Sequence, residues 1–113
     1  MKIPIDTNQF EDFIVENKLL DKTRENMTQC LKSWYEDDKE HFLEDMWADF
    51  DTVINTYTFE NEGVSFSKSY SYEPPLDYIS VWIRIYDNEG SYCAEYTAFY
   101  DNDLNCFDDK IAG

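Results

Sequence analysis

The hydrophobic period of this 113-residue chain changes at Thr52, and that change limits the folds open to it. Before Thr52, apolar residues recur every three or four positions, as at Met27, Leu31 and Trp34, which is typical of amphipathic helices. After Thr52, apolar and polar residues alternate, which is typical of half-buried strands. Helices therefore precede strands, without βαβ alternation. The sequence predicts an α+β fold with two or three N-terminal helices packed on one face of a four- or five-stranded antiparallel β-meander.

Helical spacing divides the first half of the chain into segments. A first helix is expected over residues 7–20 and a second over 23–35, with a break between them at 21–23. An extended arm is expected at residues 2–5, because Pro4 lacks a backbone donor and disfavours helix in the residue before it.

Alternation divides the second half of the chain into strands. They are expected at residues 53–60, 64–72, 78–86, 91–100 and 104–111, with a turn at 61–63 between the first two. The strand at 64–72 has one face made of serine, which is expected to face solvent. A chain of this length is expected to form a single domain, with helices over about 7–50 and the antiparallel sheet over about 53–111.

The strand at 78–86 has the clearest pattern, with two distinct faces. One face is aliphatic and is expected to lie under the helices, and it carries Ile79, Val81, Ile83 and Ile85. The other face carries Tyr78, Ser80, Trp82, Arg84 and Tyr86. Because side chains alternate between the two faces of a sheet, the turn at 87–90 decides on which face each residue of the next strand lies. It places Tyr92, Ala94, Tyr96 and Ala98 beside the isoleucines, and Cys93, Glu95, Thr97 and Phe99 beside Trp82.

The stretch from Trp34 to Asp51 concentrates negative charge. Its eight carboxylates are Glu36, Asp37, Asp38, Glu40, Glu44, Asp45, Asp49 and Asp51. Apolar residues stand among them at helical spacing, which predicts a helix with one face in the core and the other face acidic. The residues of this apolar stripe are Phe42, Leu43, Met46, Trp47 and Phe50. Asp37 and Asp38 either interrupt that helix or cap a third one, because Asp37 and Glu40 have the spacing of a capping box.

The whole chain is strongly acidic. It has 25 acidic and nine basic residues, a net charge of −16 and a sequence pI near 4.1. An aromatic content of 18% excludes a disordered acidic tail, which would be poor in aromatic residues. Charge of this sign disfavours nucleic acid and anionic membranes and favours a basic protein surface. We therefore expect no direct nucleic-acid binding and no membrane association, and no apolar run approaches the roughly 20 residues of a membrane span.

The cysteines point to a reducing environment. Cys30, Cys93 and Cys106 are odd in number and form no C-x-x-C pair, so neither a disulfide framework nor a zinc site is indicated. The residues after Met1 contain no apolar leader segment. A cytoplasmic location is expected.

No catalytic motif is present. His41 lies among carboxylates, which should raise its pKa and suit an ion-paired surface histidine better than a general base. Residues 101–105 read D-x-D-x-N, as in a calcium loop, but Cys106 replaces the required glycine and Ala112 the required glutamate. This segment is better explained as a turn. We expect no enzymatic activity, no catalytic residues, no metal and no cofactor.

Two surface features indicate a protein partner. One is the acidic stretch, and the other is the predicted outer sheet face with Tyr78, Trp82, Tyr86 and Glu95, where tyrosine and tryptophan are typical of binding hot spots. In size, acidity and aromatic content the chain resembles bacterial toxin-immunity proteins, although no motif identifies a family. The resemblance implies an inhibitor of a basic, nucleic-acid-acting toxin or nuclease, present as a monomer or homodimer.

Four alternatives remain open at this point. A phage-encoded nucleic-acid mimic, of anti-CRISPR or anti-restriction type, would use its acids as phosphate rows against a host defence nuclease. On one straight helix the eight charges would lie about 3 Å apart along the axis, near the about 3.4 Å of a DNA strand. A small ligand-binding or catalytic α+β domain would show a concave pocket that holds carboxylates with perturbed pKa values. A homo-oligomer would bury the Trp82 face, and in the simplest case the acidic face is only solvated.

Overall fold

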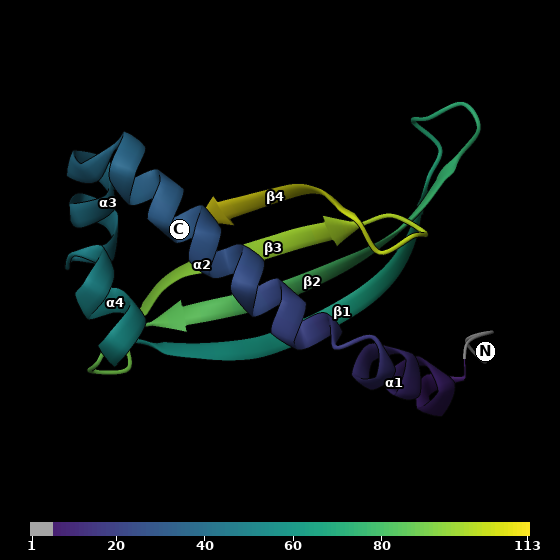
Figure 1. Cartoon of the computed structure of the whole chain (residues 1–113), viewed down its shortest axis with the longest axis horizontal. Coiled ribbons are helices and arrows are strands. Elements are labelled where there is room, and N and C mark those ends of the chain that lie inside the picture. The colour runs from purple at the N-terminus through teal and green to yellow at the C-terminus, as the bar shows by residue number, and fades with distance from the viewer. Residues whose placement is uncertain (1–5) are drawn as a thin grey trace.

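A computed structural model describes residues 6–113 and confirms the α+β fold (Figure 1). The helices are α1 (Thr7–Glu16), α2 (Leu19–Asp37), α3 (Lys39–Met46) and α4 (Phe50–Thr56). The strands are β1 (Thr58–Ser69), β2 (Leu76–Tyr86), β3 (Tyr92–Tyr100) and β4 (Cys106–Ala112), all antiparallel in the order β1-β2-β3-β4. The predicted arm at residues 2–5 lies outside the described residues.

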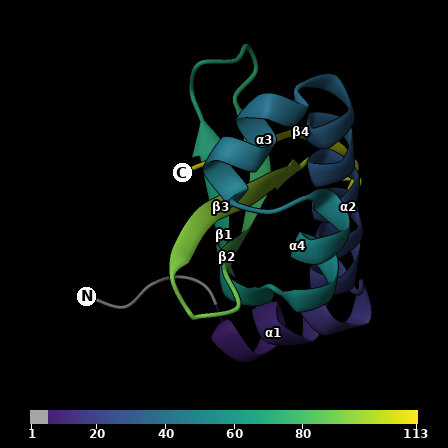
Figure 2. The same cartoon turned by 90° about the vertical axis from the view of Figure 1, so that its left-hand side faces the viewer.

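The helices and the sheet form two layers. In Figure 1 α2 crosses one face of the sheet, and Figure 2 shows α2 and α4 to one side of β1, β2 and β3. We call the face toward α2 the inner face and the opposite one the outer face. None of the helices within residues 6–113 is long and apolar enough to cross a membrane.

The first helix break differs from the prediction. Residues 21–23 lie inside α2, and the chain instead turns at Asn17 and Lys18, where Lys18 has a left-handed φ of 51°. Thr23 stays in the helix because its side chain is fully buried and its hydroxyl donates to the Leu19 carbonyl at 2.7 Å. A hydroxyl satisfied by the preceding turn removes the polar penalty that would otherwise favour a break there.

The predicted strand at 53–60 is wrong in its first half, which forms α4. The Asp49 side chain accepts a hydrogen bond from the Thr52 backbone N–H at 2.9 Å and caps this helix. Val53 lies on its buried side with no exposed surface. Capping and core packing therefore override the β propensity of this segment.

The predicted turn at 61–63 is also wrong, because β1 continues through it. The register against β2 shifts between Asn61 and Gly63, which is a β-bulge. A Cβ placed on Gly63 would lie 2.3 Å from Cζ2 of Trp82, so the indole ring occupies the space above the glycine. Glycine is needed here for close approach of the ring rather than for a turn.

Strand pairing follows the predicted parity except at one bulge. Ala94, Tyr96 and Ala98 pair with Ile85, Ile83 and Val81, as predicted. The register then shifts between Ile85 and Tyr86, so that Tyr92 pairs with Tyr86 and Cys93 is buried. The predictions for Tyr92 and Cys93 are therefore wrong, because one inserted residue reverses which face each side chain takes.

The core lies between the inner face and the helices. It includes Leu19, Met27 and Leu31 of α2, Phe42 and Met46 of α3, and the isoleucines of β2. Two fully buried tyrosines place polar hydroxyls within it. Tyr96 donates to Oδ2 of Asp109 at 2.8 Å, and the Tyr100 hydroxyl lies 2.7 Å from Oγ1 of Thr23. Each hydroxyl thus has a hydrogen-bond partner, which avoids the cost of an unpaired buried polar group.

Candidate protein-interaction site

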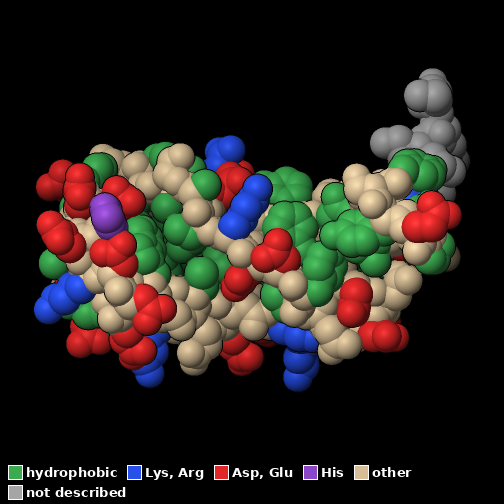
Figure 3. All heavy atoms as spheres, turned by 90° about the horizontal axis from the view of Figure 1, so that it is seen from above, with side chains coloured by type: hydrophobic (Ala, Val, Ile, Leu, Met, Phe, Trp, Pro, Cys, Tyr) green, Lys and Arg blue, Asp and Glu red, His purple; other side chains and the backbone are tan. Residues whose placement is uncertain are grey.

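All eight predicted acidic residues are exposed, and they lie at the end of the molecule formed by α3 and the adjoining helix ends. Figure 3 shows acidic side chains gathered at that end. We call this set, Glu36, Asp37, Asp38, Glu40, Glu44, Asp45, Asp49 and Asp51, the acidic surface. The prediction that these residues present a charged surface is confirmed.

The acidic residues lie on three helices rather than one. The third helix capped near Asp38 is one of the two predicted arrangements, whereas the break at Trp47 was not predicted. The chain leaves helical geometry at Asp38, with φ −148°, and again at Trp47, with φ 63°. Asp38 rather than Asp37 caps α3, since its Oδ1 accepts from the His41 backbone N–H at 3.4 Å. The even spacing of eight charges along one axis is therefore lost.

Two acids of this surface have structural roles. Oδ2 of Asp38 lies 2.6 Å from Nδ1 of His41, and this hydrogen bond holds the pKa of His41 above 6.5 and that of Asp38 below 3.8. The prediction of an ion-paired surface histidine is confirmed. Hydrogen bonding by Thr52 lowers the pKa of Asp49 below 3.8.

The other six carboxylates make no hydrogen bond or ion pair with any residue from 6 to 113. They are Glu36, Asp37, Glu40, Glu44, Asp45 and Asp51. The lysine among them, Lys39, has its Nζ 5.5 Å from the centre of the Tyr35 ring. Fixed negative charge without an internal partner favours cationic groups from another molecule.

Trp47 is an exposed aromatic residue within this surface, which helical spacing wrongly assigned to the core stripe. Its side chain is 61% exposed. Among residues 6–113, it belongs neither to the buried core nor to the partly buried hydrophobic residues that pack against the core. Its left-handed φ of 63° is unfavourable for a bulky residue. The Trp47 N–H donates to the Leu43 carbonyl at 2.9 Å, and the Tyr57 hydroxyl donates to the Met46 carbonyl. The turn is thus held by fixed contacts while the indole ring faces outward.

The sequence contains a signal for the end of α3 near Trp47. Asp49 precedes Phe50 and Thr52 with the composition of an N-cap, and a new cap implies that the preceding helix has ended. Leu43, one turn before Trp47, is 38% exposed, so the surface also carries aliphatic area.

The outer face carries the second predicted set, and its aromatic rings contact one another. The centre of the Tyr78 ring lies 6.0 Å from that of Phe99 and 6.3 Å from that of Phe107. Trp82 lies over Gly63, as described above. These contacts between rings within the molecule leave Tyr78 and Trp82 half-buried.

The other residues predicted for this face also have partners within the molecule. Arg84 has its Nε 3.3 Å from Glu95 and its Nη1 3.9 Å from Glu62. The Tyr86 ring lies edge-on to Tyr92, with 6.1 Å between the ring centres. The structure therefore does not bring Tyr78, Trp82, Tyr86 and Glu95 together with the acidic surface, because the two sets belong to different layers.

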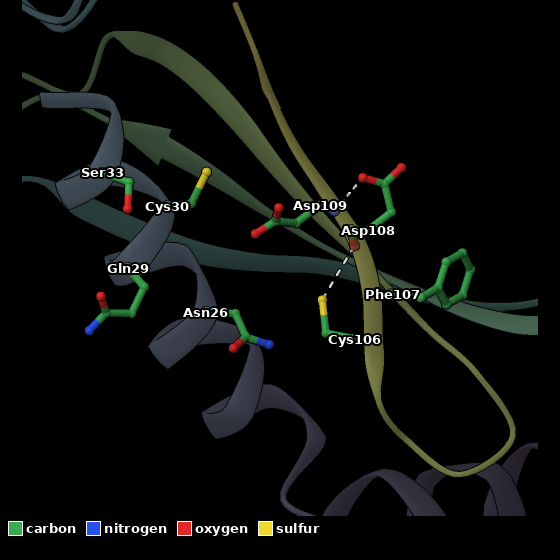
Figure 4. A pocket seen from close by; sticks show the side chains of 8 residues that line it. All are labelled: Asn26, Gln29, Cys30, Ser33, Cys106, Phe107, Asp108 and Asp109. Carbon is green, nitrogen blue, oxygen red and sulfur yellow. Dashed lines mark hydrogen bonds between the residues drawn. The ribbon is translucent and has the colours of Figure 1, made fainter. Parts of the chain in front are cut away.

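Two shallow hollows lie along β4. The first, about 550 Å³, is lined by Asn26, Gln29, Cys30 and Ser33 of α2 and by Cys106, Phe107, Asp108 and Asp109 (Figure 4). In Figure 4 Phe107 points away from α2, whereas Asp109 points toward it. The second, about 450 Å³, includes Trp34, Asp45, Ile111 and Gly113, and it shares Cys30 and Asp109 with the first.

Cys30 lines both hollows. Burial, and secondarily the charge of Asp109, raises the pKa of Cys30 to about 11, so its thiol is protonated near neutral pH. No group of three histidine, cysteine or acidic side chains in the described part of the chain is placed to hold a metal ion.

The segment 101–105 is a turn, as predicted. The Asp101 carboxylate accepts from the backbone N–H groups of Asp103 and Asn105 at 2.9 and 3.0 Å. Such bonds are typical of aspartate in turns. The acidic surface combines carboxylates that have no partner among the described residues with the exposed ring of Trp47. No protein-family model, curated protein or solved structure matches the chain.

Proposed function

We propose that this protein is a small, non-enzymatic inhibitor that binds a basic, nucleic-acid-acting protein, as bacterial toxin-immunity proteins do. The observation that carries the proposal is Trp47, a largely exposed indole in an unfavourable backbone conformation among carboxylates without internal partners. Neither core packing nor backbone preference accounts for a tryptophan at this position. An anchor for a partner surface does.

The two components of this surface supply different parts of binding. Six unpaired carboxylates and a net charge of −16 attract a basic partner over long range and raise the association rate. The indole ring and Leu43 supply apolar area that slows dissociation once contact is made. We place this activity in the cytoplasm, in agreement with the free thiols of Cys30, Cys93 and Cys106.

The nucleic-acid mimic receives less support from the geometry. Its acids would have to follow regular phosphate rows, but the acidic surface is divided over parts of three helices by the breaks at Asp38 and Trp47. Competition with DNA or RNA distinguishes the two classes, because a mimic occupies the nucleic-acid site itself.

The proposal can be tested with two charge-matched triple variants. The test variant, Glu36→Gln with Glu44→Gln and Asp45→Asn, neutralises the acidic surface without touching the caps Asp38 and Asp49. The control variant, Glu11→Gln with Asp12→Asn and Glu16→Gln, makes the same three changes on α1. All six side chains are exposed, so both variants should fold.

Each variant is used to capture proteins from a lysate of the source organism at low and at high salt, followed by mass spectrometry. We expect the wild type and the α1 variant to retain one basic, nucleic-acid-acting protein at low salt, and the acidic-surface variant to lose it. Purified wild type should then inhibit that protein. Equal capture by both triple variants, or capture without inhibition, contradicts the proposal.

A further inference from the structure

The free edge of β4 can accept another strand. β4 is the last strand in the sheet order and pairs only with β3 among the described strands. Its backbone N–H and C=O groups that point away from β3 have no strand partner among the described residues, although the Asp109 N–H donates to Oδ1 of Asp108 at 2.9 Å. In the middle of the sheet β4 is the uppermost strand in Figure 1, so Figure 3, seen from above, looks toward this edge, and hydrophobic side chains are visible there. The strand contains neither proline nor glycine.

The opposite edge, at β1, is less open. Its ladder is interrupted by the bulge between Asn61 and Gly63, and bulges bend a strand away from new pairing. One of its backbone groups is occupied, because the Arg24 guanidinium donates to the Phe59 carbonyl at 2.8 Å. The register shift of β4, by contrast, lies at its first residues, between Phe99 and Tyr100 of its partner strand.

The two hollows described above flank β4 on the side of α2. A strand added beside β4 would direct alternate side chains toward the inner face, where α2 and the hollows of about 550 and 450 Å³ lie. Side-chain pockets at every second residue are what gives strand addition its specificity.

The charge along this edge favours a cationic occupant. Asp108 and Asp109 line the first hollow, and Asp45, Asp109 and Lys110 line the second, so acidic side chains outnumber the single basic one. The cation of β4, Lys110, has its Nζ 5.9 Å from the centre of the outer-face Phe99 ring. Through Asp45 the second hollow is continuous with the acidic surface. A second copy of this chain would bring together two net charges of −16, which disfavours it.

We propose that an extended segment of the partner, with lysine or arginine at alternate positions, pairs with β4 as a fifth strand and runs toward Asp45. This inference rests on the proposed function, because it assigns the binding mode of the same basic partner. It adds a backbone-mediated contact to the attraction that the acidic surface supplies.

The test uses a seven-residue peptide of alternating lysine and valine as the probe. Its control is a peptide with the same lysines and with proline in place of valine, which has equal charge but cannot form a strand ladder. Amide hydrogen exchange of the full chain is followed by NMR with each peptide. We expect the lysine–valine peptide to slow exchange about tenfold or more at every second residue of β4, and the proline peptide to have no such effect.

Two variants test whether the first hollow takes part in binding the peptide. Ser33→Trp fills the first hollow from α2 and should remove the protection, whereas Asn55→Trp places the same side chain on exposed α4 and should retain it. Equal protection by both peptides, protection without alternation, or protection unchanged by Ser33→Trp overturns the proposal. So does protection that appears without peptide and grows with protein concentration, which would assign the edge to a second copy.

Failure here can be separated from failure of the proposed function. If β4 shows no alternate protection but the Glu36, Glu44 and Asp45 variant still loses the basic partner, strand addition is wrong and the inhibitor function stands. If that variant captures the partner as well as the wild type, the inhibitor function fails, and the proposed role of β4 fails with it.

Discussion

Trp47 on the acidic surface and Trp82 on the outer face are the same residue type in opposite environments. Trp47 is 61% exposed, lies outside the set packed against the core and has a left-handed backbone. Trp82 is half-buried, lies in a regular strand and covers Gly63. The second tryptophan is explained by the contacts it makes within the molecule. The first is not, and that difference identifies it as the better candidate for an external contact.

The charged residues of the two regions differ in the same way. On the outer face Arg84 lies between Glu62 and Glu95, so its charge is already compensated. On the acidic surface, six of eight carboxylates have no partner among residues 6–113. Residue type alone therefore does not identify a binding surface. What matters is whether the fold has already paired the groups.

The largest expected effect is that of Trp82→Ala on stability. Removing a half-buried indole that covers the bulge should lower the free energy of unfolding by about 3 kcal/mol, measured by urea denaturation. Affinity for the partner, measured below the unfolding transition, should stay unchanged. A loss of affinity at unchanged stability would instead show that Trp82 contacts the partner.

Gly63→Ala tests the same contact from the other side. The new Cβ would lie 2.3 Å from Cζ2 of Trp82, so the ring or the strand must shift. The expected loss is about 2 kcal/mol of unfolding free energy, by thermal or urea denaturation. The double variant Gly63→Ala, Trp82→Ala should lose less than the sum of the two single changes. Full additivity would show that the ring and the glycine do not interact.

Trp47→Gly should separate binding from stability. Glycine adopts the left-handed conformation without strain, so the free energy of unfolding should stay within about 1 kcal/mol of the wild type. Partner affinity should fall by about tenfold or more, measured by calorimetry or surface plasmon resonance. Trp47→Phe, which retains an aromatic ring, should restore part of the affinity. Unchanged affinity for Trp47→Gly would remove the observation on which the proposed function depends.

The smallest expected effect concerns pH at His41. Asp38 raises the pKa of His41 above 6.5, so the contribution of this pair to stability is fully present below pH 6.5 and is lost as pH rises through the raised pKa. Its size is limited because both side chains are exposed. The melting-temperature difference between wild type and His41→Gln should therefore shrink from about pH 6 to about pH 9.

Binding should show the opposite trend over the same range. Loss of the His41 proton adds one net negative charge to the acidic surface, which should speed association with a basic partner as pH rises. In His41→Gln this pH-dependent increment should be absent. An equal rise in association rate in both proteins would mean that His41 is not the titrating group.

Much of the fold follows from patterns within short segments. The change of period at Thr52 and the alternation of Ile79 to Ile85 predict the α+β class and the inner face of the sheet, because each depends on neighbouring residues only. Parity correctly places Ala94, Tyr96 and Ala98 beside the isoleucines but fails for Tyr92 and Cys93. A bulge is a single inserted residue, and alternation carries no sign of it until the strands are paired.

Composition and local patterns are enough to show that this chain is acidic, folds as α+β and concentrates carboxylates between Glu36 and Asp51. Where that stretch breaks, and which side chains remain unpaired, depends instead on contacts between distant parts of the chain. The Tyr57 hydroxyl donates a hydrogen bond to the Met46 carbonyl and so holds the turn at Trp47, and the Trp82 ring packs against Gly63 on the outer face. Both are contacts between residues more than ten positions apart in the chain, so no local pattern in the sequence records them.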